Sequence, residues 1–184
     1  SKDQVGNRIL CSEALVDSNN VRTGELNDEE LSKLAETSGE LSQAQIYVDD
    51  TPGISVMEIR AKCRKLKLEK DIGLVIIDYL QLIDSSSRYS GSRQQEVSEI
   101  SRALKTMALE LEVPVIALSQ LSRSVEKRED KKPVLSDLRE SGSIEQDADI
   151  VAALHAPDVE VPVGDEVPNP IQLIILKHRN GPTK

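Results

Sequence analysis

The chain has 184 residues, of which 38% are hydrophobic and 30% charged, a balance typical of a soluble protein with a substantial core. Its formal net charge of −9 excludes a generally basic surface, although a local basic loop can still bind nucleic-acid phosphates. The two histidines and two cysteines have no metal-binding spacing, no apolar run is long enough to span a membrane, and the first residues do not have the pattern of a signal peptide. We therefore expect no zinc site, no membrane partner and a cytoplasmic location.

The first part of the chain predicts helices followed by a strand. Apolar residues recur at helical spacing over residues 4–16, and residues 27–41 begin with an asparagine N-cap and acidic residues in the first turn. The segment QIYVDDTPG, residues 45–53, has the composition of a strand that ends in a turn. Ser55 and Glu58 then form a capping box, which predicts the start of another helix.

An aliphatic run that ends in one carboxylate is the first candidate for chemistry. Residues 74–77 follow Gly73 and precede Asp78, and such a run is typical of a parallel strand covered on both faces. An ionised group inside that layer would cost roughly several kcal/mol, so we expect Asp78 at the strand's exit. The carboxyl ends of parallel strands line the ligand crevice, where a carboxylate can hold a metal ion or its bound water. A cap on an ordinary turn is the alternative interpretation.

Three further strands are predicted, and two of them also end in polar residues. Apolar residues at helical spacing over 93–112 predict a long helix, which leads into the strand VPVIALSQ ending at Gln120. DIVAALH and IQLIILKHR predict two more strands, the last ending in Lys177 and Arg179. The helix between the Asp78 and Gln120 strands predicts a right-handed crossover, so we expect these strands to be parallel neighbours with both polar residues at one edge.

Four blocks of sequence together resemble a known family. The segments VIIDYLQLI, RQQEVSEISRALKTMALELEVPVIALSQLSR, DLRESGSIEQDADIV and KHRNGPT occur in the order seen in the motor domain of bacterial replicative DNA helicases, the DnaB-like family. The resemblance implies a RecA-like three-layer α/β fold with a mostly parallel central sheet, here truncated, in a single partial domain over residues 1–184. It also implies ATP and Mg²⁺ as cofactors, a homohexameric ring around single-stranded DNA, and primase and a helicase loader as partners.

The resemblance assigns roles to the strand-end residues. Asp78 would act on magnesium as the Walker B aspartate, Gln120 would sense the γ-phosphate, and Lys177 and Arg179 would reach the ATP of a neighbouring subunit. These roles suit the chemistry, because magnesium prefers oxygen ligands, an amide hydrogen-bonds to phosphate, and a guanidinium stabilises charge on a transferring phosphoryl group. From the residues alone, the alternatives are a strand-end amide bonded to backbone and a solvated strand terminus.

The segment DLRESGSIEQDAD contains the expected DNA contacts. By the resemblance, Arg139, Glu140 and Gly142 belong to the loop that follows the backbone of single-stranded DNA, since an arginine offers planar donors and a glycine permits close approach. A helix-capping turn with a solvated Arg–Glu pair is the alternative. The basic run SRSVEKREDKKP, residues 122–133, is interrupted by acidic residues, and both DNA contact and a solvated loop remain open for it.

The phosphate-binding motif of this enzyme class is missing from the sequence. None of the nine glycines lies in a G-x-x-x-x-G-K-[ST] pattern, whose backbone and lysine cradle the phosphates. By the resemblance, the chain looks like a fragment that starts after the catalytic glutamate and ends before the last strands. We therefore expect the chain alone to be inactive towards ATP. The alternatives to a part of a helicase are a non-catalytic interaction fragment of the same domain and another RecA-like ATPase.

Overall fold

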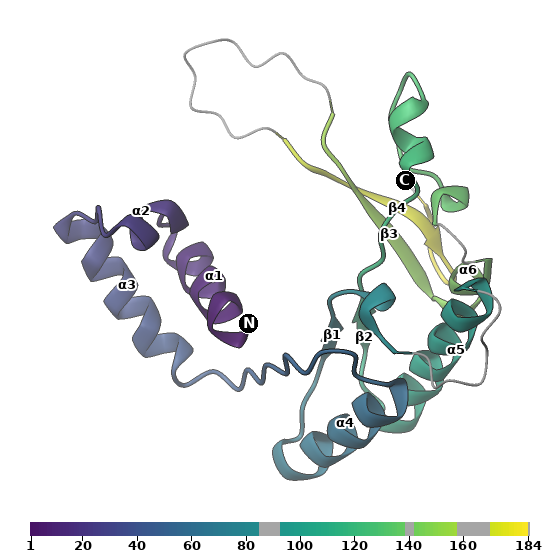
Figure 1. The fold of residues 1–184 in the computed structure, drawn as a ribbon, viewed down its shortest axis with the longest axis horizontal. Helices are drawn as coiled ribbons and strands as arrows, with labels where there is room; N and C mark the ends of the chain where they lie inside the picture. Colours follow the sequence, from purple (N-terminus) through teal and green to yellow (C-terminus); the bar gives the residue numbers. More distant parts are fainter. Residues whose placement is uncertain (85–92, 139–141, 158–169, 184) are drawn as a thin grey trace. The chain divides into compact units, whose positions relative to one another are not determined.

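The computed structural model of the protein describes residues 1–84, 93–138, 142–157 and 170–183 (Figure 1). The chain divides into two compact units, Ser1–Pro52 and Gly53–Lys184, and each is described by itself. The single domain expected from the sequence stays a prediction. Among the described helices, none has both the length and the hydropathy that a bilayer span requires.

The first unit contains three helices, α1 (Lys2–Ala14), α2 (Ser18–Thr23) and α3 (Asp28–Leu41). The helices expected over residues 4–16 and 27–41 are thus confirmed, and the second begins with the capping geometry that its sequence predicts. The Asn27 side chain accepts a hydrogen bond from the Glu30 N–H at 2.9 Å, and the Glu30 carboxylate accepts one from the Asn27 N–H at 3.0 Å. A small core of this unit consists of Ala14, Val16 and Leu34, with Leu10, Val21 and Leu26 against it.

The prediction of a strand over residues 45–53 is wrong. This segment is not paired with any described strand, and Ile46, Tyr47 and Val48 are exposed. A β-type composition fits a pleated, half-buried surface, and it produces a strand only where a partner supplies the ladder of hydrogen bonds.

The second unit alternates helices and strands, as the sequence predicts from Ser55 onward. The helix after Ser55 is confirmed with its capping box, since the Ser55 N–H donates to the Glu58 carboxylate at 2.9 Å. The elements are α4 (Val56–Lys70), β1 (Val75–Ile77), α5 (Arg93–Leu111), β2 (Val115–Ala117), α6 (Gly142–Asp147), β3 (Ile150–His155) and β4 (Gln172–His178), with short 3₁₀ turns at Leu80–Leu82, Arg123–Lys127 and Leu135–Asp137.

The strands form two separate pairs in the described part of the chain (Figure 1). Strands β1 and β2 are parallel, with Val75 opposite Val115 and Ile77 opposite Ala117, which confirms that the two strands are parallel neighbours. The right-handed course of the crossover through α5 stays a prediction. The parallel sheet expected from the sequence is present in this first pair, and β3 and β4 form a separate antiparallel pair. The apolar run of β4 predicts a strand but not its direction, because side chains alternate between the two faces in both kinds of pair.

The main core lies between α4, α5 and one face of the β1–β2 pair. Met107 of α5 is fully buried at its centre, and Val75, Ile77 and Val115 pack against the cluster from the strands. The opposite face of the pair is open within the described residues, since Ile76 is 62% exposed and Ile116 is 49% exposed. The expected burial of this strand on both faces is therefore wrong for the chain as it stands. The cluster comprises Ile59, Cys63, Leu80, Ile83, Ile100, Leu104, Met107, Leu111 and Val113.

Candidate active site

Asp78 and Gln120 line one hollow at the end of the parallel pair. The ladder continues past the strands, because the Leu118 N–H donates to the Ile77 carbonyl and the Leu80 N–H to the Leu118 carbonyl, each at 2.9 Å. The chains that leave β1 and β2 therefore stay side by side at the same edge of the sheet. The hollow measures about 330 Å³ and is lined by Asp78, Tyr79, Leu118, Ser119 and Gln120. The prediction that Asp78 and Gln120 lie at the same edge, after adjacent strands, is confirmed.

Gln81 supports this edge and was not singled out from the sequence. Its side-chain N–H donates to the Ser119 hydroxyl at 3.1 Å, and its backbone carbonyl accepts from the Arg93 guanidinium at 2.8 Å. The Gln81 side-chain oxygen is buried and has no hydrogen-bond partner in the part of the chain that the structure describes. A polar residue inside the otherwise apolar segment LQLI is the signal that points to it.

The residues of the hollow fit a magnesium ion that would be held mainly by the phosphates of a bound nucleotide and by waters, not by protein side chains. Among the described residues, no group of three or more histidine, cysteine, aspartate or glutamate side chains could form a metal cage. Magnesium bound with a nucleotide needs no such cage, since one or two carboxylates, waters and phosphate oxygens complete its shell. Asp78 is exposed at the rim of the hollow and is the one carboxylate among its lining residues.

Lys177 lies at the end of β4 and contacts the last turn of α6. Its ammonium donates to the backbone carbonyl of Ala148 at 2.7 Å and also to that of Glu145. These carbonyls lie at a helix C-terminus, where backbone acceptors lack partners within the helix and cations are favourable. The alternative of a solvated strand terminus is therefore wrong for Lys177.

Arg179 is bound to the same segment of chain. One terminal nitrogen of its guanidinium donates to the Gln146 carbonyl at 2.9 Å, and the other pairs with the Asp149 carboxylate at 2.9 Å. The Arg179 backbone N–H also donates to the Asp149 carbonyl at 2.8 Å. None of the residues that line the hollow comes from β4, so Lys177 and Arg179 form a group apart from Asp78 and Gln120.

Asp149 connects this group to the long helix α5. Its carboxylate accepts from the Lys105 ammonium as well as from Arg179. The hydrogen bond from Lys105, together with the charge of Arg179, holds the pKa of Asp149 below its ordinary value, although burial acts in the opposite direction. Asp149 is thus ionised at neutral pH and available to orient the guanidinium. The sequence carries no local signal for this role, because the three residues lie on different elements.

The expected DNA-contacting residues are described only in part. Arg139 and Glu140 lie outside the described residues, and Gly142 is the exposed first residue of α6. A side chain at Gly142 would meet no atom within 4 Å in the described structure, so the backbone there is open to approach.

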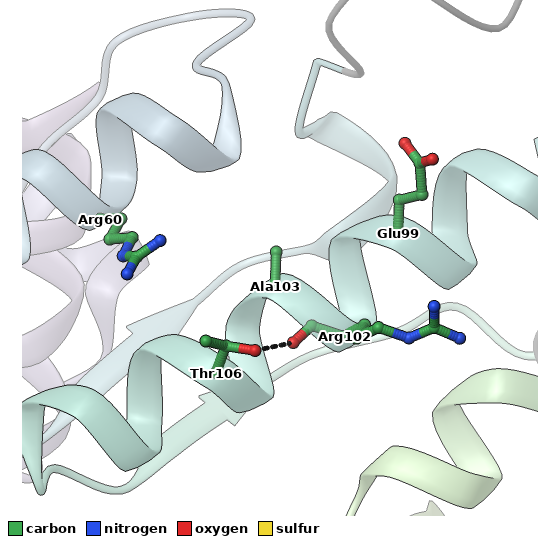
Figure 2. Close-up of a pocket in the computed structure, with 5 residues that line it drawn as sticks. All are labelled: Arg60, Glu99, Arg102, Ala103 and Thr106. Carbon is green, nitrogen blue, oxygen red and sulfur yellow. Dashed lines mark hydrogen bonds between the residues drawn. The ribbon is translucent and has the colours of Figure 1, made fainter.

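A second hollow, of about 310 Å³, lies between α4 and α5 (Figure 2). Figure 2 shows Arg60 facing it from α4, and Glu99, Arg102, Ala103 and Thr106 along α5. No predicted site residue lies there, and Arg60 is paired with Glu110 through a hydrogen bond of 2.8 Å. We assign no role to this hollow.

Comparisons with known proteins agree with the arrangement of these elements. A family model described as the DnaB-like helicase C terminal domain matches residues 1–184. The replicative DNA helicase DnaB of Geobacillus stearothermophilus is 59% identical to this chain over 182 residues, which cover 99% of the chain. The chain spans 40% of the length of that relative.

Two solved structures have the same fold at 40% sequence identity. One is the structure of a DnaB-like replicative helicase studied with its interactions with primase, and the other is the ATPase domain of a second protein. Each superposes on the whole chain with a TM-score of 0.88, and the chain covers 44% of the first and 66% of the second.

Proposed function

The chain belongs to the DnaB-like helicase C-terminal domain family, and from this premise we propose that it is part of a ring-shaped, ATP-dependent replicative DNA helicase. Its RecA-like α/β fold is that of the ATPase domains it superposes on. The proposed activity is translocation on single-stranded DNA with unwinding of the duplex. The observation that carries the proposal is the meeting of Asp78 and Gln120 at one hollow, at the carboxyl edge of the parallel strands.

At this hollow the residues have distinct proposed roles towards magnesium and ATP. The Asp78 carboxylate would hold the ion or one of its waters, and the ion would neutralise charge on the phosphates. The Gln120 amide can donate to a phosphate oxygen and accept from a water, so its contacts change when the γ-phosphate leaves. Leu118 joins the two strand ends through backbone hydrogen bonds, which would transmit such a change between them.

Lys177 and Arg179 are proposed to act on the nucleotide of the adjacent subunit in a homohexamer. Their separation from the Asp78 hollow supports this role. When a site is shared between the subunits of a ring, the two groups of site residues in one chain face different neighbours. An arginine supplied from a neighbour stabilises charge on the transferring phosphoryl group.

The remaining proposals concern DNA and protein partners. Arg139 and the backbone at Gly142 would contact the phosphates of single-stranded DNA, and Glu140 would orient the arginine or accept a hydrogen bond from the neighbouring loop. The exposure of Gly142 and the open space around it support the close approach of a phosphate. Primase and a helicase loader are proposed partners, and the cytoplasm is the proposed location. Another RecA-like ATPase, one of the alternatives from the sequence, does not fit the family match.

On its own, the chain is proposed to be a non-catalytic part of this machine. Phosphate affinity in the class resides in a glycine-rich loop before a helix, and no such motif occurs in the sequence. The purified chain is therefore expected neither to hydrolyse ATP nor to bind it tightly. Turnover by the chain that disappears on Asp78→Ala would contradict this expectation.

The function itself is tested by Asp78→Asn in a full-length protein that contains this chain. We expect DNA-stimulated ATP hydrolysis and strand unwinding to fall by on the order of a hundredfold or more, because the charge stabilisation supplied by a bound metal is worth several kcal/mol. Asp71→Asn is the matched control, since Asp71 is an exposed carboxylate paired with Lys67 at 2.6 Å outside the hollow. Equal activity of the two variants would reject the assigned site.

A further inference from the structure

The guanidinium of Arg179 is fixed by two acceptors rather than by one. The Asp149 carboxylate and the Gln146 carbonyl each take a different terminal nitrogen, at 2.9 Å in both cases. The backbone adds a third connection, from the Arg179 N–H to the Asp149 carbonyl. Two separate acceptors define the plane of the fork, whereas a single ion pair leaves it free to rotate.

Asp149 is itself held by the helix at the centre of the main core. Its second carboxylate oxygen accepts from Lys105 of α5, two residues before the fully buried Met107. Contacts therefore run from α5 through Asp149 to Arg179. The Arg179 and Asp149 side chains are 47% and 53% exposed, and an ion pair at that exposure adds little to folding stability. Its main effect is on the orientation of the arginine.

We propose that Asp149 is a positioning residue for Arg179, and that it prepares the guanidinium to meet the nucleotide of the neighbouring subunit. This inference rests on the proposed function, in which Arg179 acts across the subunit interface. A long side chain with many rotamers loses conformational freedom when it binds, and a carboxylate that already holds it reduces that loss. Asp149 touches no substrate in this account and acts only through Arg179.

The contacts leave donors for a phosphate. An arginine carries five N–H groups, and the bonds to Asp149 and Gln146 use two of them. The anchored fork can therefore keep its position and still donate to phosphate oxygens. A lysine at this position has no second terminal nitrogen with which to bond both acceptors in the same plane.

The test is a double-mutant cycle on Asp149→Asn and Arg179→Ala in a full-length protein that contains this chain. The readout is single-turnover, DNA-stimulated hydrolysis of radiolabelled ATP. We expect Asp149→Asn alone to lower the hydrolysis rate about tenfold, with little change in the ATP concentration that gives half the maximal rate. The size is taken from the loss on removing a partner that orients a metal ligand, about tenfold at the low end. In the Arg179→Ala background, the same change should have no further effect, because there is no guanidinium left to orient.

The outcomes distinguish a failure of this inference from a failure of the proposed function. If Arg179→Ala leaves hydrolysis unchanged, the cross-subunit role fails, and the inference fails with it. If Arg179→Ala impairs hydrolysis but Asp149→Asn does not, or if the two losses multiply, Asp149 does not position Arg179. Asp149→Glu, which shifts the carboxylate by one methylene, replaces Asp149→Asn in the cycle if the first variant does not assemble. Asp71→Asn again controls for removal of an exposed carboxylate, and an equal loss there would also overturn the inference.

Discussion

At the scale of single residues, Asp137 illustrates how one carboxylate orders an irregular segment. It is 3% exposed and accepts from the Val134 N–H at 2.8 Å, from the Ser124 hydroxyl at 3.4 Å and from the Arg128 guanidinium. Burial alone would raise the pKa of Asp137, but the hydrogen bonds from Val134 and Arg128 outweigh it and hold the pKa below its ordinary value of 3.8. The Asp137 carboxylate thus holds the chain near both ends of the basic run 122–133 through its hydrogen bonds. This run lies shortly before the expected DNA contacts in the sequence.

This arrangement predicts a pH-dependent loss of stability on Asp137→Asn. A carboxylate whose pKa is lower in the folded state stabilises the protein above its unfolded-state pKa, and the benefit is lost as the pH falls through the folded-state value. We expect Asp137→Asn to cost about 1.5–3 kcal/mol near neutral pH, as for hydrogen bonds to charged groups. The difference from the unmodified chain should shrink below about pH 4, near the unfolded-state pKa of an aspartate.

Urea unfolding of the chain between pH 3 and pH 7, a range that spans roughly the titration of an aspartate, measures this difference. Asp130→Asn is the control, because Asp130 is exposed in the same segment and its change is expected to stay within about 0.5 kcal/mol. A cost for Asp137→Asn that does not vary with pH would show that the carboxylate charge is not what orders the loop.

At the scale of elements, α5 links the core to both candidate sites. Its apolar face packs on α4 and on the β1–β2 pair, its first residue Arg93 bonds to Gln81, and Lys105 bonds to Asp149. The amphipathic pattern of the helix is local in sequence, and for that reason the helix and its buried face were predictable.

Burial in α5 predicts different costs for two neighbouring large-to-small changes. Met107→Ala should destabilise the chain by about 2–5 kcal/mol, because it removes a fully buried side chain and leaves a cavity among tightly packed neighbours. Leu109→Ala, in the same helix but 68% exposed, should change stability by no more than about 0.5 kcal/mol. Equal costs in urea unfolding would mean that α5 does not pack as described.

Other features of the elements could not be predicted from local pattern. The segment around Tyr47 has strand composition but no described partner strand, and the antiparallel direction of β4 appears only in its pairing with β3, not in its own apolar run. At the candidate site, the sequence correctly predicted that Asp78 and Gln120 lie close together, because both follow strands that are parallel neighbours and end at the same edge. The attachment of Arg179 to Asp149 was missed, because it depends on how β3, β4 and α6 pack, and no spacing in the sequence encodes that contact.

At the scale of the whole molecule, the two groups of site residues lie on different parts of the second unit. Asp78 and Gln120 share a hollow, whereas Lys177 and Arg179 are bound to the end of α6. A single chain with this arrangement would hold one half of each of two nucleotide sites. We therefore propose that the active site is completed only between subunits of a ring.

Mixed rings of full-length subunits test whether the active site is shared between subunits. Rings made only of Arg179→Ala subunits should lose ATP hydrolysis by on the order of a thousandfold, as for other arginine fingers, and Arg179→Lys should behave nearly like Arg179→Ala because it lacks the planar guanidinium. Rings made only of Asp78→Ala subunits should lose on the order of a hundredfold or more, through the loss of the metal-side carboxylate. Random mixing of equal amounts of the Asp78→Ala and Arg179→Ala subunits restores an intact pair at roughly a quarter of the interfaces. We expect hydrolysis to return in the mixture. Mixed rings that assemble normally but stay inactive would contradict this expectation and would place Arg179 in the site of its own chain.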